Sequence, residues 1–87
     1  MEIVFTIQAK EDLVFWKKSG IISVQNKISR MLEEISVNPH SLIGIGKPEK
    51  LKHNFSGCFS RRITVEHRLI YKVEREEIII LALRFHY

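Results

Sequence analysis

The sequence contains little cysteine, proline or glycine: one, two and four residues respectively in a chain of 87. The single cysteine, Cys58, excludes an internal disulfide, and a CxxC zinc motif is absent. Few glycines and prolines, together with 45% hydrophobic residues, argue against disorder and collagen-like repeats. These figures predict a single globular domain over residues 1–87.

Long hydrophobic runs are also missing. The longest, residues 78–83, is far shorter than the roughly 20 residues that a membrane-spanning helix needs. The N-terminal segment MEIVFTIQ carries an acid where a secretory signal carries basic residues. We therefore expect a cytoplasmic protein with no membrane partner.

Acidic residues are outnumbered: ten Asp and Glu stand against fourteen Lys and Arg, which gives a net charge of +4. A basic surface suits a polyanion, because each neutralised phosphate releases counterions. Many basic small proteins bind no nucleic acid, however, so charge alone leaves RNA binding open.

The N-terminal half predicts one strand and two helices. Residues 2–7 are β-branched and aromatic, which is typical of a strand. Residues 8–20 place Ala9, Leu13 and Trp16 on one helical face, and Gly20 is suited to end that helix. Residues 21–39 predict a longer helix that ends at Pro39. Its apolar stripe, which we interpret as core rather than a partner-binding face, comprises Ile21, Val24, Ile28, Met31, Leu32 and Ile35.

The C-terminal half predicts strands over residues 57–64, 67–73 and 77–87, with a short, polar strand-like segment at 49–53. Residues 74–77 predict a hairpin turn between the last two strands. The predicted fold class is α+β: two N-terminal helices packed on one face of a twisted antiparallel sheet, in the order β-α-α-β-β-β.

Strand alternation places basic side chains together on the sheet face away from the helices. We expect Arg62, Arg68, Arg84 and His86 to point to that face, because aliphatic side chains alternate with them. The edge segment before them supplies Glu49, Lys50, Lys52 and His53. The predicted result is a basic patch with two imidazoles and one carboxylate.

These residue types suit metal-free RNA cleavage. That reaction needs a base for the 2′-hydroxyl proton, an acid for the leaving 5′-oxygen and cations for the phosphate. Glu49 or His53 could be the base and His86 the acid, while Arg62 and Arg68 could clamp the phosphate in bidentate fashion.

A purely structural interpretation is also available. Arg62 could pair with Glu66, and Arg68 with Glu74 or Glu77, to form a solvated charge ladder across the strands. The four histidines are scattered without HxH or HExxH spacing, so we expect no metal site and no cofactor.

The blocks GKPE, LKHN, SRRI and EHRL, within residues 46–73, and the terminal RFHY are very similar to the YoeB (Txe) toxins of the RelE superfamily. The resemblance covers the chain from Trp16 to Tyr87. One departure is visible: a block that often reads Gly-x-Trp-Ser in the family reads Gly-Cys-Phe-Ser at residues 57–60.

The resemblance implies a ribosome-dependent endoribonuclease that cuts mRNA in the ribosomal A site. It also implies a YefM/Phd-like antitoxin that covers the basic site, and a homodimer. Carried over by position, the general base matches Glu49, the general acid His86 and the phosphate-binding arginines Arg62 and Arg68. Supporting, substrate-binding positions match Lys52, His53 and Tyr87. The alternative is a non-catalytic RNA-binding, ribosome-binding or protein-binding module of the same fold.

Overall fold

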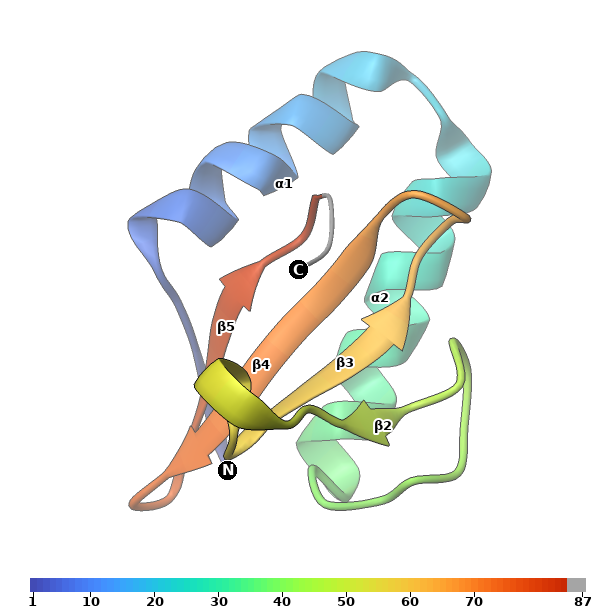
Figure 1. Cartoon of the computed structure of the whole chain (residues 1–87). Helices are drawn as coiled ribbons and strands as arrows, with labels where there is room; N and C mark the ends of the chain where they lie inside the picture. The colour runs from blue at the N-terminus through green and yellow to red at the C-terminus, as the bar shows by residue number, and fades with distance from the viewer. Residues whose placement is uncertain (85–87) are drawn as a thin grey trace.

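The computed structural model describes residues 1–84 (Figure 1). Within these residues, two helices follow the first strand and four further strands follow the helices, the first of them in the short segment 49–53, which confirms the predicted order and the α+β fold class. The elements are β1 (Glu2–Phe5), α1 (Ile7–Ser19), α2 (Ile22–Val37), β2 (Glu49–Lys50), the 3-10 turn η1 (His53–Phe55), β3 (Cys58–Arg62), β4 (Arg68–Glu74) and β5 (Glu77–Ala82).

The sheet has the strand order β1-β5-β4-β3-β2. The strands β2 to β5 pair antiparallel, as predicted, but β1 pairs parallel with β5 and aligns Glu2 with Glu77. The sheet is therefore mixed rather than wholly antiparallel. Hairpin reasoning applies only to strands that follow one another directly, whereas two helices separate β1 from the next strand. The predicted segment 49–53 is likewise a strand only at Glu49–Lys50 before the chain turns into η1.

The core lies between the helices and one face of the sheet, and α2 passes behind β3 and β4 in Figure 1. Four residues of the predicted stripe are buried and one is partly buried, which confirms the core interpretation: Val24, Ile28, Met31 and Ile35, with Leu32 beside them. Ile21 is the exception, because it is the exposed N-cap residue of α2. On the sheet, Phe59, Leu69, Tyr71, Ile78 and Ile80 face this stripe.

Helix α1 is fixed at both ends by local sequence. Thr6 caps its N-terminus and accepts a hydrogen bond from the Ala9 N–H at 3.1 Å. Gly20 ends it in the left-handed conformation with φ of 72°, as the sequence predicted. The helix also buries a charged residue, Asp12, which lies on the same side as Trp16.

Asp12 and Trp16 together hold the backbone of Leu83, just after β5 ends. The Asp12 carboxylate accepts the Leu83 N–H at 2.8 Å, and the Trp16 indole N–H donates to the Leu83 carbonyl at 2.7 Å. Gln8 donates to the same carboxylate at 2.9 Å. This arrangement satisfies buried polar groups and ties the C-terminal end of the sheet to α1.

Asp12→Ala is expected to lower the free energy of unfolding by about 1–3 kcal/mol, because the buried Leu83 N–H would lose its acceptor. Urea unfolding followed by circular dichroism measures the change. Glu11→Ala is the matched control, since Glu11 is the exposed neighbour on the same helix. Equal midpoints for the two variants would contradict a structural role for the Asp12 carboxylate.

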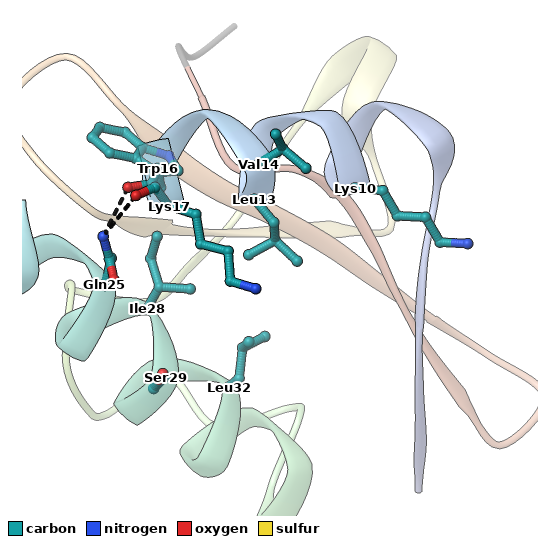
Figure 2. Close-up of a pocket in the computed structure, with 9 residues that line it drawn as sticks. All are labelled: Lys10, Leu13, Val14, Trp16, Lys17, Gln25, Ile28, Ser29 and Leu32. Atoms are coloured by element: carbon teal, nitrogen blue, oxygen red, sulfur yellow. Dashed lines mark hydrogen bonds between the residues drawn. The ribbon is translucent and has the colours of Figure 1, made fainter. Parts of the chain in front are cut away.

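A hollow of about 380 Å³ lies between α1 and α2 (Figure 2). Gln25 closes one end by donating to the Trp16 carbonyl at 2.9 Å. The lining is largely apolar and comprises Lys10, Leu13, Val14, Trp16, Lys17, Gln25, Ile28, Ser29 and Leu32. None of the predicted site residues within 1–84 is among them. Over residues 1–84, no helix combines the length and hydrophobicity that crossing a membrane requires.

Candidate active site

Three neighbouring strands bring Glu49 and Arg68 into contact, although 19 positions separate them in sequence. The register aligns Glu49 of β2 with Ser60 of β3, and Ser60 with Ile70 of β4, so these side chains share one sheet face. Arg68 donates from Nη1 to the Glu49 carboxylate at 2.9 Å and to the Ser60 hydroxyl at 3.2 Å. The face is the one opposite the helices, as the alternation predicted.

A pocket of about 200 Å³ opens beside this contact. Lys52, immediately before η1, adds a second cation, while Phe55 and Ile70 supply apolar surface. Among residues 1–84, the lining comprises Glu49, Leu51, Lys52, Phe55, Ser60, Arg68 and Ile70. A carboxylate, two cations and an apolar floor therefore meet in one concave site.

Arg62 lies directly across the β3–β4 ladder from Arg68. Like charges at directly opposite positions destabilise a sheet, because their Cβ atoms are only about 4.5–5.5 Å apart. Arg62 is exposed, and a bound anion between the two guanidinium groups would relieve their repulsion. The structure thus brings together four predicted site residues: Glu49, Lys52, Arg62 and Arg68.

The matching family model is described as the YoeB-like toxin of bacterial type II toxin–antitoxin systems, and it covers residues 5–87. The chain belongs to this family. Toxin YoeB of Escherichia coli strain K12 is 39% identical over 87 residues, which is the whole of both chains.

Two solved structures of YoeB from Staphylococcus aureus are also similar to this chain. One is a heterotetrameric YoeB–YefM toxin–antitoxin complex, with a TM-score of 0.84. The other is a YoeB dimer, with a TM-score of 0.85. Each is 42% identical and matches 100% of this chain and 98% of the other.

Two predicted positions of the YoeB pattern, His86 and Tyr87, lie outside the described residues. A third, His53, is exposed on η1, with a left-handed φ of 60°, and it does not line the pocket. The roles of these three residues stay predictions.

Arg84 and Lys50 do not share the face of the YoeB-like site, contrary to expectation. The Arg84 guanidinium lies 3.6 Å from the ring centroid of Phe15 on α1, so it contacts a helix. The predicted orientation of Arg84 assumed a regular strand through that residue, but β5 ends at Ala82. Lys50 aligns with core residue Phe59, so its side chain points to the helix side of the sheet.

The charge-ladder interpretation predicted the wrong ion-pair partners for the arginines on this face. Arg68 pairs with Glu49 rather than with Glu74 or Glu77, and Lys72 is the residue that contacts Glu74, at 3.2 Å. Within residues 1–84, no ion pair joins Arg62 to Glu66. The Arg62 guanidinium is therefore an exposed cation beside Arg68.

Sequence reasoning gave no role to Ser60, a buried residue that accepts a hydrogen bond from Arg68. The available signal was its spacing, because Ser60 lies two residues before Arg62 on β3 and therefore shares its sheet face. Cys58, at the variable Gly-Cys-Phe-Ser block, is half-buried, and burial raises the pKa of its thiol. Among residues 1–84, no group of three or more His, Cys, Asp or Glu side chains could hold a metal ion.

Arg61, adjacent to Arg62, lies on the helix side and is completely buried. It donates from Nη1 to the carboxylate of Glu34 on α2 at 2.5 Å. The hydrogen bond from the Ile45 N–H and, next, the Arg61 guanidinium lower the pKa of Glu34 below its ordinary value. Adjacent arginines on β3 thus have different surroundings: one is held in an internal ion pair and the other is free to meet a ligand.

Proposed function

We propose that this YoeB-family chain is a metal-independent, ribosome-dependent endoribonuclease that cuts mRNA in the ribosomal A site and so inhibits translation. The observation that carries the proposal is the contact of Glu49 with Arg68 inside a cationic pocket, with Arg62 directly across the ladder. Such a surface offers a proton acceptor within a few ångströms of groups that bind phosphate.

In the proposed reaction Glu49 takes the proton of the 2′-hydroxyl, and the 2′-oxygen attacks the adjacent phosphorus. The bond to the 5′-oxygen breaks, and His86 donates a proton to that leaving oxygen. The products are a 2′,3′-cyclic phosphate and a 5′-hydroxyl. The Glu49 side chain is 55% exposed, so an RNA backbone can reach it. His53 remains the alternative base.

Arg68 can contact Glu49 and substrate together. A guanidinium has five N–H donors, and the two contacts of Arg68 both use Nη1. The remaining donors can bind phosphate oxygens and stabilise charge that builds during attack. Arg62 would bind the same or the next phosphate, while Lys52 and Tyr87 would hold the flanking RNA.

The S. aureus relatives support the proposed partners of this chain. A YoeB–YefM complex and a YoeB dimer are consistent with a YefM/Phd-like antitoxin and a homodimer here. An acidic antitoxin segment that folds over the basic pocket would block RNA entry. Ribosomes and mRNA place the proposed activity in the cytoplasm.

The first test uses wild-type protein, translating ribosomes and primer-extension mapping of the message. We expect cuts at the A-site codon and upstream fragments that end in a 2′,3′-cyclic phosphate. A message with a single 2′-deoxynucleotide at the cut position should resist cleavage, because it lacks the attacking oxygen.

The same message with 2′-deoxynucleotides outside the A site is the control and should be cut normally. A chain that binds ribosomes with strong salt dependence but leaves every message intact would be the non-catalytic binder instead. Cleavage that yields a 2′-hydroxyl and a 3′-phosphate directly would contradict 2′-oxygen attack.

A further inference from the structure

The segment that carries Glu49 into the site, residues 38–48, is held to the body of the protein at Ile45. The Ile45 N–H donates to Glu34 Oε1 at 2.9 Å, and Arg61 Nη1 donates to the Ile45 carbonyl at 3.2 Å. The partners Glu34 and Arg61 also bond to one another. We call them the Glu34–Arg61 pair. It binds both backbone polar groups of one loop residue.

Gly44 lets the loop lie directly on this pair, and Gly46 lets it lie against the backbone of Arg62. A Cβ at Gly44 would clash with Glu34 Oε1, and one at Gly46 would stand 2.8 Å from the Arg62 carbonyl oxygen. Both glycines have a positive φ, of 143° and 83°, a backbone conformation that residues with a side chain rarely adopt. The Gly46 carbonyl also accepts the Arg62 N–H at 2.6 Å. The loop is therefore closely seated immediately before β2.

Glu49 follows Ile45 by only four residues, with buried Pro48 between them. Its strand, β2, has two residues, so strand pairing alone holds it weakly. On the other side, the Leu51 N–H donates to the Cys58 carbonyl at 2.9 Å. The position of Glu49 thus depends on contacts on each side. The upstream contacts are the Glu34–Arg61 pair at Ile45 and the hydrogen bond from the Arg62 N–H to the Gly46 carbonyl.

We propose that Glu34 and Arg61 are positioning residues that hold Glu49 against Arg68 for proton abstraction, an inference that rests on the proposed function. Arg61 is completely buried, and moving a cation out of water is costly unless its partners are well placed. Here the partners are the Glu34 carboxylate and the Ile45 carbonyl, and Glu34 also accepts the Ile45 N–H, four residues before Glu49.

The decisive variant is Glu34→Ala, because Glu34 is half-exposed and its removal leaves the apolar core intact. We expect kcat for message cleavage to fall by about 100-fold with KM unchanged, as a displacement of about 1 Å can produce. Glu34→Gln should recover most of the rate, since its amide oxygen can still accept the Ile45 N–H. Glu33→Ala, the same change at the preceding exposed residue, should cut as wild type does.

Amide hydrogen exchange supplies a measurement that needs no activity. Leu51 follows Glu49 in the sequence, whereas the contact at Ile45 precedes it. Faster exchange of the Leu51 N–H in Glu34→Ala would therefore show that losing the Ile45 contact loosens the backbone through Glu49. The proposal is overturned if folded Glu34→Ala keeps the wild-type kcat, or if Leu51 exchange is unchanged. Should wild-type protein fail to cut any message, the proposed function fails, and Leu51 exchange alone decides whether the pair holds this edge.

Discussion

Glu49→Gln and His86→Gln are each expected to slow cleavage of ribosome-bound message by about 10²–10⁴-fold, because each removes one proton-transfer group. Ribosome affinity should stay near wild type, since the arginines and lysines that meet phosphate remain. Glu49→Gln also keeps an oxygen that can accept from Arg68, so the pocket should keep its shape. Single-turnover cleavage on translating ribosomes, with binding measured by co-sedimentation, separates the two quantities.

His53→Gln distinguishes the two candidate bases. Because His53 is exposed and lies outside the pocket lining, we expect this variant to cut at close to the wild-type rate. Lys50→Gln is a second control, from the same strand but the opposite face. A wild-type rate for Glu49→Gln with a large loss in His53→Gln would transfer the role of base to His53.

Local alternation was enough to predict the main features of the site. Ser60 and Arg62 alternate with core residues on β3, and Arg68 does the same on β4, so their common face followed from side-chain parity. Parity needs a regular strand, however. Beyond Ala82 the strand ends, and the prediction for Arg84 was wrong because its side chain packs against Phe15 instead.

Contacts between distant segments could not be predicted in the same way. The parallel pairing of β1 with β5 depends on how two helices return the chain, which no local pattern records. Asp12 has the sequence signature of an ordinary charged helix residue, yet it is buried because the Leu83 N–H lies against that face. The Glu34–Arg61 pair likewise joins α2 to β3 across the loop; Arg61 stands in the SRRI block, but nothing in the sequence links that block to Glu34.

The difference between Arg61 and Arg62 shows what the structure adds. Adjacent strand residues must point to opposite faces, so one of any two neighbours faces the helices. A buried arginine is tolerated only with partners, and Glu34 and the Ile45 carbonyl provide them. The sequence block Ser-Arg-Arg therefore combines a structural cation with a ligand-binding one. Strand parity assigns Arg61 to the helix side, and the position of Glu34 on α2 shows which partner holds it there.

Arg68→Ala is expected to lower kcat for message cleavage by about 10²–10³-fold, because it removes a donor that contacts the proposed base and that we propose binds the scissile phosphate. Stability should change by only about 1 kcal/mol, since the Glu49 side chain is 55% exposed and stays hydrated when Arg68 is removed. Arg68→Lys should remain well below wild type, because an ammonium cannot bind two phosphate oxygens in parallel while it also contacts Glu49. Arg75→Ala, at the exposed β4–β5 turn, is the matched control.

The double variant Glu49→Gln/Arg68→Ala tests whether these residues act as one unit. Their side chains are 2.9 Å apart, so we expect the combined loss in rate to be clearly smaller than the product of the two single losses. If the two groups acted independently, their fold-losses in rate would multiply. That result would mean that Arg68 binds RNA without influencing the base. A single-variant Arg68→Ala that cuts as fast as wild type would remove Arg68 from the mechanism, and Arg62 would then be the only arginine left to hold the scissile phosphate.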